Sequence, residues 1–436
     1  MVWWEIISIG LALLLGLFIT GMPIFLAFLV MIVMAVFVTM GPAGFGLVVN
    51  SLYTTGSSLT LGTVSLFILL GEVLFRSGTV NVLMNSLDTI IGRIRGRHYL
   101  LSVALATVLG SLSGSAMAVG AMMGRSLLPI MLERKYDVRL SIGTILGGAC
   151  LAPIIPPSIL GIIVATLANV SVSSLLIAGI IPGLLIASLF VGYCMMRVSL
   201  NPDLAPELQE RGKVTRKEFF KALVGLLPFS LIIFMVIGLI LLGIATPSEA
   251  AATGVLGSLI TAAIYRKLSF RMMFVAFSEA AILSAVILLI IASAVMFTQL
   301  LAFTGATGAL TKVVANLELN QWVFLFVLLL LPFVLCMFID GLGLLLILIP
   351  IYKPIVNALG WDPVWFWLIF LITLILGAIT PPFGYVLFAV KAAAPKISMS
   401  TIFSASWPFV GITLIGILIL ILIPGLVTFL PNLLKP

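Results

Sequence analysis

Long apolar runs separated by short polar loops are the dominant pattern of this chain. A helix that crosses a membrane needs about 20 mostly apolar residues. Ten runs meet that length: 3–20, 22–40, 58–76, 140–168, 174–197, 222–243, 246–265, 281–302, 364–393 and 405–430. The pattern therefore predicts an all-α polytopic membrane protein.

Composition supports the same class. Of 436 residues, 62% are apolar and 8% are charged, whereas soluble domains have about 45–50% and about 25%. A soluble globule cannot cover that much apolar surface with polar side chains. Water-soluble enzymes, disordered proteins and fibrous proteins are excluded.

One further apolar run, 99–132, predicts a re-entrant helical hairpin. Basic residues flank both of its ends, and Lys and Arg mark the cytoplasmic side of a membrane. As one helix its 34 residues would span about 51 Å, longer than the bilayer core of about 30 Å. Its middle, Gly110–Ser115, is rich in Gly and Ser and is typical of a turn. We expect the chain to enter from the cytoplasm and return there.

A second run, 321–358, predicts a hairpin of the opposite sense. Asp340–Gly343 lies at its middle, and its flanks are nearly free of Lys and Arg. It is expected to enter from the outside. With both termini outside, the inside segments hold 18 of the 22 Lys and Arg residues, the outside segments hold Lys312, Lys353 and Lys435, and Arg125 lies within the first hairpin.

The second half of the chain resembles the first at an offset of about 225 residues. Pro156 then falls on Pro381, Pro157 on Pro382, and Ser173 on Ser398. Each half has five crossings and a hairpin, and an odd number of crossings makes the halves insert in opposite senses. The prediction is an inverted-topology repeat, with halves at 1–198 and 222–436 and a cytoplasmic linker at 199–221.

Four breaks in matching positions are the candidate sites of chemistry. Two are the hairpin tips, and two are proline breaks inside crossings 140–168 and 364–393. Broken helix at membrane depth must face protein or a polar cavity. Freed carbonyls and hydroxyls suit a small hard cation such as sodium, and helix N-termini suit a carboxylate. Close helix packing is the alternative for each break taken alone.

Ionisable residues within the runs divide between structural and functional roles. Asp340 is the strongest functional candidate. Glu72 is expected to pair with Arg76, and Glu249 to cap a helix start after Thr246.

The sequence lacks the residues that metal binding, ATP hydrolysis and nucleophilic catalysis would require. Cys150, Cys194 and Cys336 lie far apart in apolar runs, and no Cys/His spacing for a metal exists. His98, among Arg93, Arg95 and Arg97, is expected to be a solvated loop residue. No Walker loop is present, and no histidine in the membrane could serve as the base for a nucleophile. The chain is not expected to be an enzyme, and no cofactor is expected.

Longer motifs then resemble a known family. They are Gly110–Ala116 (GSLSGSA), Leu128–Asp137 (LPIMLERKYD), Gly147–Ser158 (GGACLAPIIPPS), Ala178–Gly183 (AGIIPG), Met337–Gly341 (MFIDG) and Gly377–Gly384 (GAITPPFG). Together they resemble the large, DctM-like membrane subunit of TRAP transporters, the tripartite ATP-independent periplasmic transporters.

The resemblance implies an elevator-type mechanism driven by co-transported sodium. It also implies two protein partners, a small four-helix membrane subunit and a periplasmic substrate-binding protein that delivers an organic acid. A lipid bilayer of the bacterial or archaeal cytoplasmic (inner) membrane would surround it, and no nucleic acid partner is expected.

The resemblance also implies site residues. A first sodium site would use Ser111, Ser113, Gly114, Pro153, Pro156 and Ser158. A second would use Asp340, Gly341, Gly377 and Thr380. Substrate would lie near Ser115, Pro157, Pro382, Arg125 and Lys391. Two alternatives stay open: a stand-alone divalent-anion/sodium symporter of the same architecture, and an ion channel.

Overall fold

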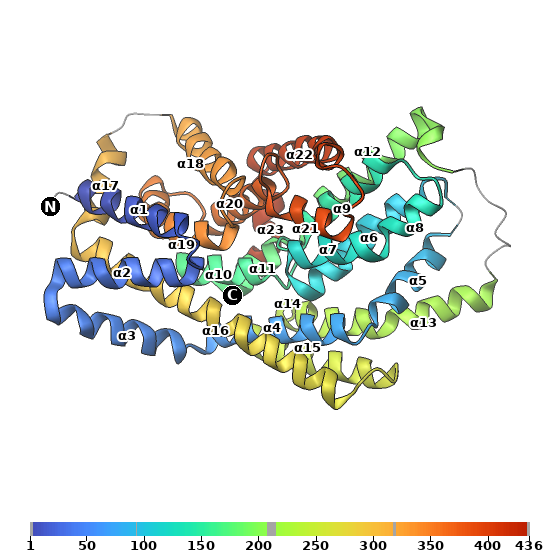
Figure 1. Ribbon diagram of the computed structural model, residues 1–436, viewed down its shortest axis with the longest axis horizontal. Helices are drawn as coiled ribbons and strands as arrows, with labels where there is room; N and C mark the ends of the chain where they lie inside the picture. The colour runs from blue at the N-terminus through green and yellow to red at the C-terminus, as the bar shows by residue number, and fades with distance from the viewer. Residues whose placement is uncertain (1–2, 93, 207–214, 317–319, 434–436) are drawn as a thin grey trace.

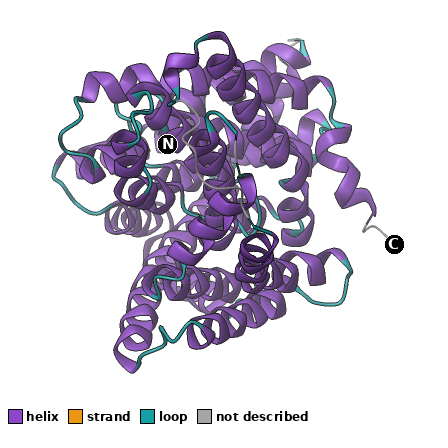
Figure 2. Cartoon of the chain, turned by 90° about the vertical axis from the view of Figure 1, so that its right-hand side faces the viewer, coloured by secondary structure: helices purple, strands orange, loops and turns teal. Residues whose placement is uncertain are grey.

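The computed structural model describes residues 3–92, 94–206, 215–316 and 320–433, and within these ranges the chain folds into helices and loops without strands (Figures 1 and 2). The first half contains α1 (Trp3–Ile19), α2 (Ile24–Met40), η1 (Gly41–Ala43), α3 (Gly44–Gly56), α4 (Leu59–Arg76), α5 (Val80–Ile91), α6 (Arg97–Ser113), α7 (Ala116–Ser126), α8 (Leu128–Glu133), α9 (Val138–Leu151), α10 (Ile159–Ala168), α11 (Val172–Ala178) and α12 (Ile180–Leu200).

The second half follows after a short 3-10 turn, η2 (Pro202–Leu204). It contains α13 (Arg216–Ile233), the π-helical turn η3 (Phe234–Gly238), α14 (Leu239–Leu241), α15 (Pro247–Ile264), α16 (Phe270–Phe303), α17 (Ala306–Asn316), α18 (Gln321–Cys336), α19 (Gly341–Leu359), α20 (Pro363–Ala378), α21 (Tyr385–Ala393), α22 (Met399–Leu422) and α23 (Gly425–Leu433).

Within the described ranges, eight segments are long and apolar enough to cross a membrane. They are Phe25–Gly56, Leu59–Arg76, Ala116–Glu133, Val172–Leu200, Arg216–Leu241, Phe270–Phe303, Gly341–Leu359 and Met399–Leu422. The crossings expected at 140–168 and 364–393 are each split into two shorter helices, since the proline breaks interrupt them. The protein is thus an all-helical, multi-pass membrane protein.

Several helices differ from the apolar runs. Helices α3, α5 and α17 were not anticipated, because a search for runs of about 20 apolar residues does not register short helices with one polar face. Helix α16 begins at Phe270, eleven residues before the expected crossing 281–302. The expected crossing 405–430 is wrong as one helix, because α22 ends at Leu422 and α23 starts at Gly425.

Helix starts follow local capping chemistry. At the start of α15, Thr246 accepts a hydrogen bond from the Glu249 backbone, and the Glu249 carboxylate accepts one from the Thr246 backbone over 2.8 Å. The expected cap is confirmed. The expected pair between Glu72 and Arg76 is also confirmed, with Nε and Oε2 2.6 Å apart.

The helices form two packed groups (Figure 1). In one, α4 packs on α15 and α16, α16 also packs on α2 and α3, and α13 packs on α5. In the other, α6 packs on α9 and α18 packs on α20, with α22 against α9. The second group contains both hairpins and both proline breaks.

The two halves interlock inside the second group. Helix α7, the returning arm of the first hairpin, packs along α21 of the second half. Helix α10, which follows the first break, packs against α19 and α20. The helix that follows each break thus packs on a helix more than 100 residues away in the sequence.

Helix order repeats between the halves at an offset close to 225. Helices α5, α9 and α10 correspond to α17, α20 and α21. The single helix α16 takes the place of both α3 and α4.

Candidate functional site: two hairpin tips packed on two helix breaks

The first tip is a two-residue turn. Helix α6 continues to Ser113, Gly114 adopts φ +61°, and Ser115 caps α7 by accepting a hydrogen bond from the Ala118 N–H over 3.3 Å. The expectation that the whole of Gly110–Ser115 forms the turn is therefore wrong.

Close packing explains why Gly110 is a glycine. A β-carbon there would lie 2.6 Å from the Cα of Ala152 on the facing break. The residue lets two backbones approach each other, so its presence reflects helix contact and not a turn.

The first break, residues 152–158, is buried throughout. Ser158 holds it together: its hydroxyl donates to the Pro153 carbonyl and accepts from the Gly161 N–H over 2.9 Å, which caps α10. A buried hydroxyl that both donates and accepts fixes the break and the following helix in one geometry.

The first tip packs directly on this break. A β-carbon on Gly114 would lie 2.9 Å from the Ile159 nitrogen and 3.1 Å from the Pro157 carbonyl oxygen. This contact brings Ser113 and Gly114 beside Pro157 and Ser158.

The predicted hydroxyls of the first tip have local partners. Ser111 donates to the Val108 carbonyl over 2.8 Å, and Ser113 accepts from the Ser115 N–H over 3.4 Å. Both side chains are buried. Each hydroxyl keeps unused acceptor capacity, so these bonds leave room for a ligand.

The second tip is displaced relative to expectation. Helix α18 ends at Cys336 and α19 begins at Gly341, so the break comprises residues 337–340 and not Asp340–Gly343. Asp340 caps α19, with its Oδ2 accepting from the Leu342 N–H over 3.0 Å. A carboxylate at a helix start is also favoured by the helix dipole.

The end of α20, which leads into the second break (residues 379–384), packs on the first arm of the second hairpin. A β-carbon on Gly377 would lie 2.6 Å from the Phe333 carbonyl oxygen and 2.7 Å from the Cys336 Cβ. Thr380 is fully buried, and its hydroxyl donates to the Leu376 carbonyl over 2.7 Å. Gly341 and Gly377 therefore lie at the contact between the hairpin and α20, while Asp340 and Thr380 form hydrogen bonds within their own segments.

The remaining predicted residues are spread out. Pro157 is buried and Pro382 is exposed, one in each break. Arg125 is exposed in the last turn of α7, away from the tip. Lys391 lies near the end of α21, where its ammonium donates to the carbonyls of Pro395 (2.8 Å) and Ile397 (2.6 Å). Lys391 thereby closes the loop after its own helix.

Sequence reasoning missed a buried polar cluster at the base of the first hairpin. His98 is 2% exposed in the first turn of α6, so the expectation of a solvated loop residue is wrong. Arg134 donates to His98 Nε2 over 2.8 Å, and Tyr136 lies 3.0 Å from Nδ1. Asp88 of α5 pairs with Arg97 at 3.6 Å. Burial raises the pKa of Tyr136.

The chain after α12 is attached to this base. The Tyr99 hydroxyl and the Asp137 N–H both donate to the Leu204 carbonyl, over 2.5 and 3.1 Å, and Arg95 donates to the Pro202 carbonyl over 2.7 Å. Residues 199–221 were expected to be a linker, but α12 extends to Leu200 and α13 starts at Arg216. Residues 207–214 of it lie outside the described ranges.

Large permease proteins of TRAP transporters are similar to the chain over nearly its whole length. The large permease protein TeaC of the ectoine TRAP transporter from Halomonas elongata is 28% identical, with 98% of this chain and 99% of that protein covered. The C4-dicarboxylate large permease protein DctM of Rhodobacter capsulatus is 30% identical, with coverage of 97% and 98%.

Two solved structures share the fold. The Alcanivorax borkumensis YdaH transporter superposes with a TM-score of 0.59 at 15% identity, covering 88% of this chain and 89% of that one. MtrF of Neisseria gonorrhoeae, from a class of antimetabolite efflux pumps, gives 0.63 at 16% identity, covering 88% and 84%.

The family model of the DctM component of tripartite ATP-independent periplasmic transporters matches residues 11–426. The expected family is confirmed. This chain belongs to the tripartite ATP-independent periplasmic transporters, as their large membrane subunit.

Proposed function

We propose that this chain is the substrate-translocating subunit of a sodium-coupled transporter that imports an organic acid by an elevator mechanism. The observation that carries the proposal is the direct contact of the first hairpin tip, at Gly114, with the Pro157 carbonyl and the Ile159 nitrogen.

The contact places both kinds of helix end side by side. Helices α6 and α9 end there and present carbonyl oxygens, while α7 and α10 start there and present N–H groups. Carbonyl ends and serine hydroxyls favour a small cation, and N-terminal ends favour an anion. One contact thus supports neighbouring sodium and carboxylate binding.

Interlocking of the halves supports movement of the second helix group as one body. Because α7 packs on α21 and α10 packs on α19, neither hairpin can leave the other without breaking buried contacts. The first group, with α4, α15 and α16 at its centre, would form the static framework. Matching helix order at an offset near 225 supports an inverted-topology repeat.

The names of the relatives support the proposed substrate class. They are named for C4-dicarboxylate, sialic acid, 2,3-diketo-L-gulonate and ectoine. We propose an organic acid, delivered by a periplasmic binding protein, with a small four-helix membrane subunit beside this chain in the inner membrane.

Uptake into liposomes tests the proposal. The chain is reconstituted with its small membrane subunit, and the periplasmic protein loaded with labelled organic acid is added outside. Uptake is expected with an inward sodium gradient and not with ATP alone. Full uptake from a proton gradient in sodium-free buffer would contradict sodium coupling. Uptake without the two partners would favour the stand-alone symporter.

Cysteine labelling tests the orientation. A single cysteine near Arg134 is expected to be labelled only after the membrane is opened, since the basic loops are predicted to be cytoplasmic. Labelling from outside intact cells would contradict the first hairpin as drawn.

A further inference from the structure

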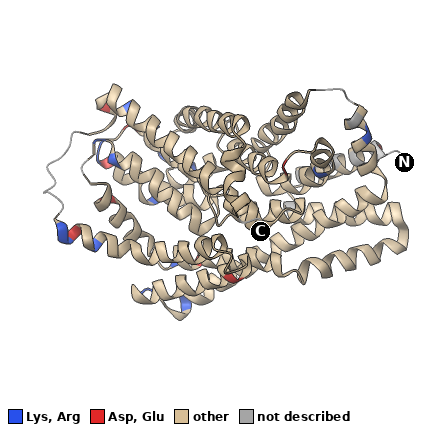
Figure 3. Ribbon diagram, turned by 180° about the vertical axis from the view of Figure 1, so that it is seen from behind, with Lys and Arg blue, Asp and Glu red and all other residues tan. Residues whose placement is uncertain are grey.

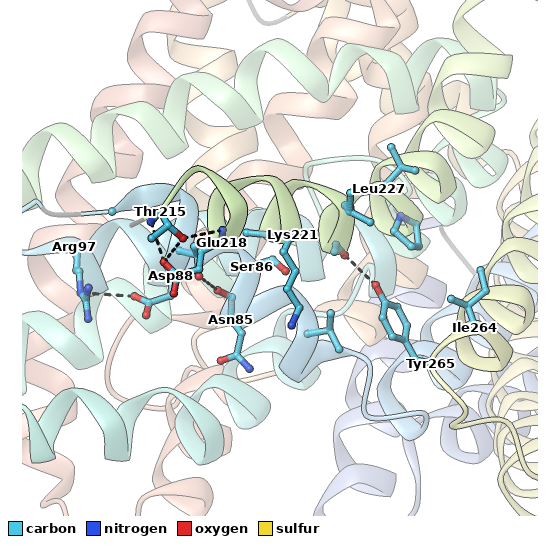
Figure 4. Close-up of a pocket in the computed structure, with 17 residues that line it drawn as sticks. Asn85, Ser86, Asp88, Arg97, Thr215, Glu218, Lys221, Leu227, Ile264 and Tyr265 are labelled. Carbon is cyan, nitrogen blue, oxygen red and sulfur yellow. Dashed lines mark hydrogen bonds and ion pairs between the residues drawn. The ribbon is translucent and has the colours of Figure 1, made fainter. Parts of the chain in front are cut away.

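A cavity of about 1120 Å³ opens between α5, α13 and the end of α15 (Figure 4). Its polar lining includes Asn85, Ser86, Thr89 and Lys221, and its apolar lining includes Leu227 and Ile264. Ligand pockets typically have about 300–1,000 Å³, so this cavity has room for a group larger than a single ion.

Three helices meet closely at its floor. A β-carbon on Gly225 of α13 would lie 2.5 Å from the Ser86 hydroxyl oxygen on α5. The Tyr265 hydroxyl, just after α15, donates to the Gly225 carbonyl over 3.2 Å. The cavity is therefore a built concavity with a fixed floor, unlike the general surface of a single helix.

Among the described charged side chains that line the cavity, the Lys221 ammonium is the one that faces the space without a hydrogen bond or ion pair. Arg97 is paired with Asp88 at 3.6 Å, and the Glu218 carboxylate accepts from the Thr215 N–H and hydroxyl, both over 2.9 Å. Within the described ranges, no hydrogen bond or ion pair involves the Lys221 ammonium. Figure 4 shows Lys221 extending from α13 beside α5, near Asn85.

The apolar wall continues away from this cation. Leu227 is 64% exposed and Ile264 is 62% exposed, and Leu227 lies more than one turn beyond Lys221 along α13. Lys and Arg residues gather at this end of the molecule (Figure 3), as expected where a membrane protein meets the headgroups of a leaflet. A polar, cationic mouth above apolar walls matches a molecule with an anionic head and an apolar tail.

We propose that this cavity binds one phospholipid of the adjacent leaflet. Lys221 would hold its phosphate, Asn85 and Thr89 would face the headgroup, and an acyl chain would lie along Leu227 and Ile264. Because α5 packs both on α13 of the first group and on α6 of the hairpin group, the lipid would lie near the place where the two groups join. The proposal does not depend on sodium coupling.

Photo-crosslinking tests it. The full chain, with its membrane subunit, is placed in phosphatidylcholine vesicles that contain phosphatidylglycerol with a diazirine in one acyl chain, and adducts are mapped by mass spectrometry. Adducts are expected on residues 224–228 and 264–265, where the acyl chain would lie. Excess unlabelled phosphatidylglycerol should compete, and glycerol phosphate or inorganic phosphate should not.

Charge variants supply matched controls. Lys221→Gln should lower the adduct yield about fivefold, as expected for one lysine near an anionic headgroup, while Lys221→Arg should retain it. Lys217→Gln, one turn earlier on α13 and outside the cavity, should have no effect on it. Equal loss in both Gln variants, or adducts elsewhere only, would overturn the site. Competition by free phosphate would indicate a soluble anion, and adducts that form only when the membrane subunit is left out would indicate a protein occupant; either result overturns the lipid.

Discussion

The two hairpin–break contacts occupy matching positions but differ in character. In the first, the tip itself meets the break, through Gly114, and the side chains on either side, Ser113 and Ser158, are buried hydroxyls. In the second, the matching positions are Phe338 and Phe383. These rings are 58% and 56% exposed and lie 5.7 Å apart between centroids.

The polar groups of the two contacts also differ. The first is held by neutral oxygens, with Ser115 and Ser158 capping the helices that leave it. The second has the carboxylate of Asp340 at the tip, and α21 starts at Tyr385 after Gly384, which provides no side-chain cap. The comparison teaches that one architecture holds two environments: an enclosed contact lined by uncharged oxygens and an open contact with one acidic residue.

The largest expected effect is at the first tip. Gly114→Ala adds a β-carbon at φ +61°, 2.9 Å from the Ile159 nitrogen. The left-handed conformation costs about 1–2 kcal/mol, and the clash adds about 1–3 kcal/mol. Uptake is expected to be lost and the free energy of unfolding in micelles to fall.

Gly360→Ala is the matched control, since Gly360 has φ +67° and open space around it. It should show the conformational cost alone. Equal losses of uptake and of unfolding free energy in both variants would show that the contact of Gly114 with the first break is not the cause of the effect.

Ser158→Ala tests whether the enclosed site binds sodium. It removes the cap of α10 and the bond to the Pro153 carbonyl, at about 1 kcal/mol. The sodium concentration for half-maximal uptake is expected to rise about tenfold, as for lost support of a metal ligand. Ser171→Ala removes a similar cap from α11. An equal sodium shift there would mean that capping, and not sodium, explains the effect.

Asp340→Asn tests the charge at the open site. Asn keeps the shape and much of the capping of α19. If the carboxylate serves sodium, half-maximal uptake should need at least about fivefold more sodium, because one charge at about 4 Å contributes about 1 kcal/mol even in water. Asp362→Asn changes a similar N-cap carboxylate at the start of α20, and it should leave the sodium dependence of uptake unchanged. A wild-type response of Asp340→Asn would assign this residue to capping alone, and Asp340→Ala would then lose about 1 kcal/mol of stability.

The smallest expected effect is at the aromatic pair. A double-mutant cycle with Phe338→Ser and Phe383→Ser, which restores the residue type of the first site, should give a coupling of about 0.5–1.5 kcal/mol in the free energy of unfolding. Sodium dependence should stay unchanged in both variants. A sodium shift as large as that of Ser158→Ala would remove the functional distinction between the two contacts.

Many features of this protein could be predicted from the sequence, because they depend on interactions between residues close together in the chain. The apolar runs identify a membrane protein, the Gly, Ser and Pro motifs identify the family, and the caps and i,i+4 pair at Glu249 and Glu72 follow from residues three or four positions apart. Each is a short-range property, because helix periodicity and capping depend on neighbours within one turn.

Only the tertiary structure decided which glycine turns and which glycine packs. Gly110 and Gly114 look alike in the sequence, but Ala152 faces one and Ile159 faces the other. The sequence predicted that His98 is solvated, but Arg134 and Tyr136 contact it and bury it. Only the structure shows that α7 packs on α21 of the other half. These contacts join segments from about 36 to over 250 residues apart; burial and close approach depend on which surfaces meet, and no local pattern contains that information.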